Sequence, residues 1–123
     1  EEVEGKDILI VDDMIASGES TLDIARELKR RKARRIFIAV TFALFTEGVA
    51  SFQAAYEAGI INRVYGTNLT YFHGSPAELP WFVSVDMSSF VAYMIDILNH
   101  DESISPLFDQ SKKIGDFLKK IQR

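Results

Sequence analysis

Apolar residues are distributed along this chain in two different patterns. Stretches rich in apolar residues at residues 7–13, where they run up to the aspartates, 35–43 and 81–85, with a shorter one that ends near Thr67 and Asn68, predict four β-strands. Strands that read as apolar without alternation are typical of a parallel sheet covered on both faces, and we expect this of residues 7–13 in particular.

Between these runs, apolar residues recur three or four positions apart, which predicts helices. The first helix is expected to begin near Ser20, because Ser20 and Asp23 have the spacing of a capping box. It leads into "KRRKARR", which we interpret as a solvated helix end, where the helix dipole favours cations, rather than as a phosphate-binding patch. Its inward face is expected to consist of Leu22, Ala25 and Leu28, with Ile24 beside them.

Two further helices and a C-terminal segment follow the same pattern. A helix is expected at residues 47–58, ended by Gly59, and another after Asp86 or Ser88. Residues 110–123 predict an amphipathic helix that packs on its own domain or on a second subunit. Its apolar face would consist of Ile114, Phe117, Leu118 and Ile121.

Strands that alternate with helices call for right-handed crossover connections. We therefore predict an α/β fold of three α/β/α layers with a mainly parallel sheet. No internal repeat or linker divides the sequence, so residues 1–123 are expected to form a single domain, with residues 110–123 as a helical extension.

Composition narrows the range of functions. With 123 residues, 47% of them hydrophobic, the chain is long enough to bury a core. A net charge of -4 argues against a nucleic-acid partner, and no apolar run approaches the about 18 residues of a membrane span. The absence of cysteine excludes thiolate metal sites and favours a cytoplasmic setting. Because the first residue is Glu and not Met, we expect either a processed product or a piece of a longer protein.

The stretch "VDDMIASGEST" carries the candidate chemistry. Residues Ser17 to Thr21 combine hydroxyl groups, a glycine and the free N–H groups of a helix start, which together predict a phosphate site. Asp12 and Asp13 would repel a bare phosphate, but they suit sugar hydroxyls or a bound Mg²⁺. The sequence thus predicts a sugar-phosphate site, against the simpler alternative that these residues merely end a strand and cap a helix.

Other phosphate-binding classes fit less well. The sequence contains neither G-x-x-x-x-G-K-[ST] nor G-x-G-x-x-G, which argues against a P-loop enzyme and a dinucleotide site. A phospho-signalling receiver domain also opens with a strand ending in two acids. It needs a phospho-accepting aspartate on a later central strand, and no aspartate occurs between Asp23 and Asp86.

"VDDMIASGES" resembles the ribose 5-phosphate loop V-D-D-M-I-D-T-G-G-T of the ribose-phosphate pyrophosphokinases, the phosphoribosyl pyrophosphate synthetases. Further segments follow in the family's order and spacing: "TFALFTEGVA", "VYGTN", "FVSVDMSSFVAYMI" and "HDESISPLF". The last is similar to the closing G-E-S-V-S-x-L-F, which simple phosphoribosyltransferases lack. The resemblance covers roughly residues 5–108 and corresponds to the C-terminal half of such an enzyme.

The resemblance implies a type I phosphoribosyltransferase-like fold and an enzyme of nucleotide biosynthesis that transfers pyrophosphate from ATP to ribose 5-phosphate. It places Asp12 and Asp13 at the ribose hydroxyls, directly or through Mg²⁺. No catalytic residue is expected here, because the ATP site and a basic catalytic loop belong to the missing N-terminal half, so the isolated chain should bind without turnover. The loop around the 5-phosphate would consist of Ala16, Ser17, Gly18, Glu19 and Ser20, with Thr21 as a further donor.

The loop departs from the family pattern at residues 16, 17 and 19, among other positions. Ala16 replaces an acid, Ser17 replaces a threonine, and Glu19 stands where the family has a glycine, so that a carboxylate lies near the phosphate position. Two alternatives therefore stay open: a compact phosphoribosyltransferase, and a non-catalytic synthetase-like regulatory subunit. The family also implies homo-oligomers. His73 and His100 are interpreted as solvated or capping residues.

Overall fold

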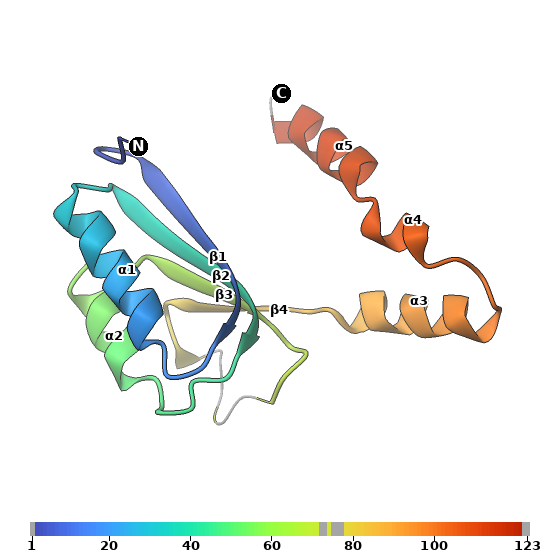
Figure 1. The fold of residues 1–123 in the computed structure, drawn as a ribbon, viewed down its shortest axis with the longest axis horizontal. Helices are drawn as coiled ribbons and strands as arrows, with labels where there is room; N and C mark the ends of the chain where they lie inside the picture. Colours follow the sequence, from blue (N-terminus) through green and yellow to red (C-terminus); the bar gives the residue numbers. More distant parts are fainter. Residues whose placement is uncertain (1, 72–73, 75–77, 122–123) are drawn as a thin grey trace. The chain divides into compact units, whose positions relative to one another are not determined.

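The computed structural model describes residues 2–71, 74 and 78–121, and divides the chain into two compact units, Glu1–Met87 and Ser88–Arg123. The first unit contains a four-stranded sheet in the order β1-β2-β3-β4, in which all neighbouring strands are parallel. Helices α1 and α2 lie on one face of this sheet (Figure 1). The predicted α/β fold with a parallel sheet is confirmed. The elements are β1 (Asp7–Ile15), α1 (Glu19–Arg30), β2 (Arg35–Ala43), α2 (Ala50–Glu57), β3 (Arg63–Thr67) and β4 (Phe82–Val85).

Among the described residues of Glu1–Met87, no helix covers the other face of the sheet (Figure 1). Right-handed crossovers that all advance in the same direction place both helices on one side, so this unit has one sheet layer and one helix layer. On β1, Ile8 and Ile10 pack against the core, whereas Leu9 and Val11 are 58% and 73% exposed. The expectation that residues 7–13 are covered on both faces is therefore not met in this unit.

The core between sheet and helices is closed by a group of aromatic rings. Phe52 on α2 stacks on Trp81 at 5.7 Å between ring centroids, and Phe45 meets the edges of Phe52, Trp81 and Phe82 at 5.0–5.8 Å. The Trp81 indole N–H donates to Gln53 Oε1 at 2.7 Å, which satisfies its polar atom inside an apolar setting. Of these rings, Phe52 lies against Gly18 of the predicted phosphate loop.

The capping box predicted for the first helix is wrong. Helix α1 begins at Glu19, its N-cap is Gly18, and no side chain caps it. Ser20 is already helical, and Asp23 instead forms an ion pair with Arg26 at 2.7 Å. The glycine takes the left-handed φ of 87° at this position, so the chain turns into the helix two residues earlier than the Ser–Asp spacing suggests. The predicted inward face is confirmed for Leu22 and Ala25, which are buried, and for Leu28, which packs on the core, but not for Ile24, which is 50% exposed.

The second unit contains three helices, α3 (Ser88–Asn99), α4 (Ser105–Phe108) and α5 (Ser111–Ile121). Helix α4 was not expected; it is a single turn with Pro106 in its first turn, where a missing N–H costs nothing. His100 lies at the end of α3 with its Nδ1 2.8 Å from the Asp96 carbonyl oxygen, as expected of a residue at a helix end. His73 lies outside the described residues.

Candidate functional site

The predicted phosphate loop lies at the carboxyl edge of the sheet, where ligands of open α/β folds bind. Residues 16–18 connect β1 to α1, and the loop that follows β2 runs beside them (Figure 1). Two backbone hydrogen bonds join the loops: Leu44 N–H donates to the Ile15 carbonyl and Thr46 N–H to the Ala16 carbonyl, both at 2.9 Å. The second loop therefore supports the first from its side.

Gly18 is required by packing as well as by backbone conformation. It is buried, and a Cβ placed on it would lie 2.2 Å from Cε2 of Phe52. No other residue fits without movement of an aromatic ring in the core. From the sequence, this glycine was expected to let a ligand approach the backbone. The structure adds that the Phe52 ring packs against the same glycine from the core side.

The start of α1 presents N–H groups that the described protein leaves free. The Glu19 N–H has only a long contact of 3.5 Å to Ser17 Oγ, and no hydrogen bond from the N–H groups of Gly18, Ser20 or Thr21 occurs among the described residues. These groups are the positive end of a helix of 12 residues. The geometry can therefore hold an anion in the way that helix starts bind phosphate.

The two aspartates lie within β1 rather than after it. Both are exposed, and each carboxylate accepts a hydrogen bond from the following backbone N–H at 2.8 Å, Asp12 from Asp13 and Asp13 from Met14. Each thus has one oxygen in a local backbone hydrogen bond, and no partner of the other oxygen occurs among the described residues. No ion pair to either carboxylate occurs among the described residues.

The side chains of the loop differ in what they offer. Ala16, Glu19 and Ser20 are exposed and Ser17 is half-buried, so these residues surround the free N–H groups. Thr21 is only 5% exposed, so its side chain is mainly part of the core and its contribution to a ligand would come from its backbone. The loop and the two aspartates lie at the same carboxyl edge of the sheet. Among the side chains predicted for the site, that of Thr21 is buried in the core.

Sequence reasoning missed polar residues that follow the later strands. Thr67 Oγ1 donates to the Thr41 carbonyl at 2.6 Å, and Asn68 Nδ2 donates to Asp86 Oδ1 at 2.8 Å. The signal was available, because carboxyl ends of parallel strands meet at one edge and each of these residues ends or follows a strand. Their hydrogen bonds tie β3, β2 and the end of β4 together at the rim of the candidate site.

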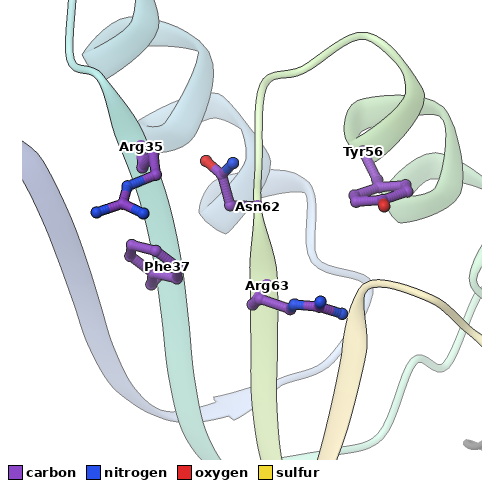
Figure 2. A pocket seen from close by; sticks show the side chains of 5 residues that line it. All are labelled: Arg35, Phe37, Tyr56, Asn62 and Arg63. Atoms are coloured by element: carbon purple, nitrogen blue, oxygen red, sulfur yellow. The ribbon is translucent and has the colours of Figure 1, made fainter.

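A pocket of about 280 Å³ lies at the amino edge of the sheet, at the opposite end from the loop. Figure 2 shows that the guanidinium groups of Arg35 and Arg63 point away from one another, so they do not converge on a common anion. Arg35 is bound to Asp7 and lies over the Phe37 ring at 5.6 Å, and Asn62 Oδ1 accepts from the Ile36 N–H. These polar groups serve the fold, and we assign no ligand to this pocket.

Two general properties of the described residues bear on the site. No cluster of three or more His, Asp or Glu side chains that could hold a metal is found in the described part of the chain. None of the helices in that part is long and apolar enough to cross a membrane.

A family model and several curated relatives match this chain. The family model described as phosphoribosyl synthetase-associated domain matches residues 1–109. The ribose-phosphate pyrophosphokinases of Vibrio cholerae serotype O1 and Haemophilus ducreyi are 32% and 33% identical over 108 residues, which is 88% of this chain and 33% of each relative. The chain thus spans about a third of the length of these curated relatives.

A solved structure is similar in fold. The crystal structure of phosphoribosylpyrophosphate synthetase from Mycobacterium smegmatis matches with a TM-score of 0.70 and 23% identity, over 82% of this chain and 33% of that one. At this identity the match shows a shared α/β fold.

Proposed function

We propose, because this chain belongs to the phosphoribosyl synthetase-associated domain family, that it is the ribose 5-phosphate-binding part of a ribose-phosphate pyrophosphokinase. Such an enzyme transfers the pyrophosphoryl group of ATP to ribose 5-phosphate and so supplies phosphoribosyl pyrophosphate for nucleotide biosynthesis. In this proposal the 123 residues bind the sugar phosphate. ATP and the catalytic groups are held by other polypeptide of a cytoplasmic, homo-oligomeric enzyme.

The observation that carries the proposal is the set of free N–H groups at Gly18, Ser20 and Thr21 beside two exposed carboxylates. The 5-phosphate would accept from these N–H groups and from the Ser17 and Ser20 hydroxyls. The ribose hydroxyls would donate to the free oxygens of the two aspartates. A ligand that is anionic at one end and rich in hydroxyls at the other matches both the N–H groups and the carboxylates at this edge.

Mg²⁺ fits the same donor set. Carboxylate oxygens are hard ligands, and Mg²⁺ is usually held by one or two carboxylates while water and substrate oxygens complete its shell. Asp12 and Asp13 would hold it with the oxygens not used by backbone N–H groups. When bound, the ion neutralises the negative charge that accumulates where a phosphorylated sugar meets two acids.

Titration of the chain with ribose 5-phosphate, followed by backbone amide chemical shifts, tests the proposal. The largest shifts are expected at Ser17, Gly18, Ser20 and Thr21, with smaller shifts at Asp13. Inorganic phosphate should shift the loop alone, and ribose without phosphate should bind far more weakly. Shifts confined to the amino-edge pocket around Arg35, or none at millimolar ligand, would contradict the proposal.

Glu19 favours a second function, a synthetase-like regulatory subunit that has lost sugar binding. The Glu19 carboxylate is exposed in the first turn of α1, at the N–H groups to which a phosphate would bind. If the wild-type loop shows no response to ribose 5-phosphate and Glu19→Gly restores it in a folded protein, the regulatory function is the correct one. If both proteins bind, Glu19 points to solvent and the catalytic assignment stands.

A further inference from the structure

Phe45 has a backbone conformation that bulky residues rarely adopt. Its φ is 46°, and the residue is only 7% exposed. The other non-glycine residues with positive φ in the described part of the chain are Lys32 and Asp101, and each of them follows the end of a helix, where a left-handed residue is common. Phe45 instead lies between β2 and α2. Strained residues persist only where their surroundings impose the conformation, and they cluster at functional sites.

The surroundings of Phe45 hold it in two ways. Its ring makes edge contacts with the rings of Phe52, Trp81 and Phe82, at 5.0–5.8 Å between centroids. Its carbonyl oxygen accepts a hydrogen bond from the Gly48 N–H at 2.8 Å. Side chain and main chain therefore both fix the loop that follows β2.

The residues on either side of Phe45 bind the carbonyl groups that precede the phosphate loop. The Leu44 N–H donates to the Ile15 carbonyl at 2.9 Å. The Thr46 N–H donates to the Ala16 carbonyl at 2.9 Å as well. Because the φ of Phe45 sets the direction of the Thr46 N–H relative to the Leu44 N–H, a different φ would break one of these bonds.

These bonds also set the direction of two N–H groups in the phosphate loop. In a trans peptide unit the C=O and the N–H point to opposite sides. Since the Ile15 and Ala16 carbonyls are bound by the loop that follows β2, the N–H groups of Ala16 and Ser17 point away from that loop. Neither N–H group donates to an acceptor among the described residues, so both extend the set of free N–H groups at the start of α1.

We propose that Phe45 is a positioning residue of the sugar-phosphate site, an inference that rests on the function proposed above. Phe45 holds the loop that follows β2 in the shape that binds two carbonyl groups, and so directs the N–H groups of Ala16 and Ser17 to the 5-phosphate. The Phe45 ring also packs on Phe52, which lies against Gly18, so it supports the phosphate loop from a second side. Phe45 does not contact the ligand in this proposal and acts only through the loop.

Phe45→Ala and the matched Ile36→Ala test the proposal in the same chain. Ile36 is fully buried at the amino end of β2, so its truncation also leaves a cavity in the core but lies at the opposite end of the strand. Phe45→Ala should weaken the binding of ribose 5-phosphate by ~10-fold or more, because misdirected N–H groups lose hydrogen bonds to a charged group. Ile36→Ala should bind as the wild type does. Calorimetric titration measures both at a temperature at which amide spectra show both variants to be folded.

Amide hydrogen exchange of the ligand-free proteins measures the positioning itself. Phe45→Ala should lower the protection of the Thr46 N–H by ~10-fold beyond any change at the Ile38 N–H, which lies in the middle of β2 and reports overall stability. Ile36→Ala should not lower the protection at Thr46 beyond that at Ile38. Phe45→Leu keeps a large apolar side chain and should restore part of the binding and of the protection. It carries the same two measurements if Phe45→Ala does not fold.

The two measurements separate this inference from the proposed function. A folded Phe45→Ala protein that binds ribose 5-phosphate like the wild type, or that keeps its protection at Thr46, overturns the inference, and so does an equal loss of binding in Ile36→Ala. A wild-type chain that does not bind ribose 5-phosphate contradicts the proposed function. The Thr46 N–H then decides whether Phe45 sets the loop, because lost protection in Phe45→Ala supports this role and unchanged protection overturns it.

Discussion

Acidic residues at the two edges of the sheet differ in whether they form ion pairs with the protein. At the amino edge, Asp7 is bound by Arg34 at 2.8 Å and by Arg35, and hydrogen bonds from first Arg34 and then Arg35 hold the pKa of this carboxyl far below its usual range. At the carboxyl edge, Asp12 and Asp13 have no cationic partner among the described residues. Acids that the fold neutralises are structural, whereas acids that it leaves to solvent are available to a ligand.

The same distinction explains the basic stretch "KRRKARR". Glu27 accepts from Arg30 and Arg31 at 2.7–2.8 Å, Lys32 pairs with Glu4 at 2.9 Å, and Lys29 Nζ donates to the Arg34 carbonyl. These cations end a helix and begin a strand, and each of those named here already binds an acid or a carbonyl oxygen of the protein. The interpretation as a solvated helix end is confirmed, and the phosphate proposal depends on the N–H groups at the other edge.

The largest expected effect concerns Gly18. Gly18→Ala should destabilise the fold by about 3 kcal/mol, because the new methyl group meets the Phe52 ring and the left-handed φ also disfavours alanine. Gly48→Ala is the matched control: its φ is 83° but a Cβ there has nothing within 4 Å, so about 1 kcal/mol is expected. Urea denaturation measures both.

Equal losses at the two glycines would mean that conformation alone matters at Gly18 and that Phe52 yields to the methyl group. A Gly18→Ala protein that keeps its stability but loses ribose 5-phosphate binding would instead mean that the glycine serves the ligand only. Either result would show that the aromatic core does not support the loop at the carboxyl edge.

Neutralising the acids at each edge tests the comparison itself. Asp12→Asn and Asp13→Asn should each weaken ribose 5-phosphate binding by ~10-fold through the loss of a charge-assisted hydrogen bond or a Mg²⁺ ligand. Asp7→Asn should leave binding unchanged, because this carboxyl lies at the other edge and is occupied by two arginines. Calorimetric titration with and without Mg²⁺ measures the three variants, and equal effects at Asp7 and Asp12 would abolish the distinction.

Local pattern predicted the strands and helices well, and tertiary contacts explain where it failed. Strand β2 has the predicted bounds Arg35–Ala43, because a continuous apolar run flanked by charges leaves little choice. Helix α2 begins at Ala50 rather than at residue 47, because Phe45 and Gly48 adopt left-handed φ values that extend the turn. For Phe45 this conformation is rare, and its contacts with three other rings stabilise it.

The candidate site was predictable in composition but not in geometry. Paired acids and a glycine-bearing helix start are visible in the sequence, and the structure places both at one edge. The burial of Thr21 and the need for glycine at residue 18, which the Phe52 ring imposes, arise from contacts with residues far away in the chain. Helix α4 was missed because one turn of four residues has too little periodicity to detect.

A smaller effect is expected at Glu19. Glu19→Gln should strengthen phosphate binding by ~3-fold, since removing a charge at ~6 Å in water is worth about 0.7 kcal/mol. The same change should lower stability by about 0.5 kcal/mol, because an acid in the first turn interacts favourably with the helix dipole. Asp23→Asn, one turn further along α1, is the control for charge on the helix, and a larger gain there than at Glu19 would place the anion elsewhere.

The smallest expected effect is the response of the amino edge to acid. Hydrogen bonds from Arg30 and then Arg31 lower the pKa of Glu27 from 4.5 to about 2, and the pKa of Asp7 is lowered as well. A carboxyl with a lowered pKa in the folded state contributes stability above its unfolded pKa, and this contribution is lost as the pH falls through the folded value. The stability difference between wild type and Glu27→Gln should therefore be present at pH 6 and vanish between about pH 4.5 and 2. It should also shrink in 1 M salt, because the pair is exposed and screened. Thermal melts between pH 6 and pH 2 measure this stability difference. A difference that persists at pH 2 would mean that Glu27 stabilises α1 by packing and not by its charge.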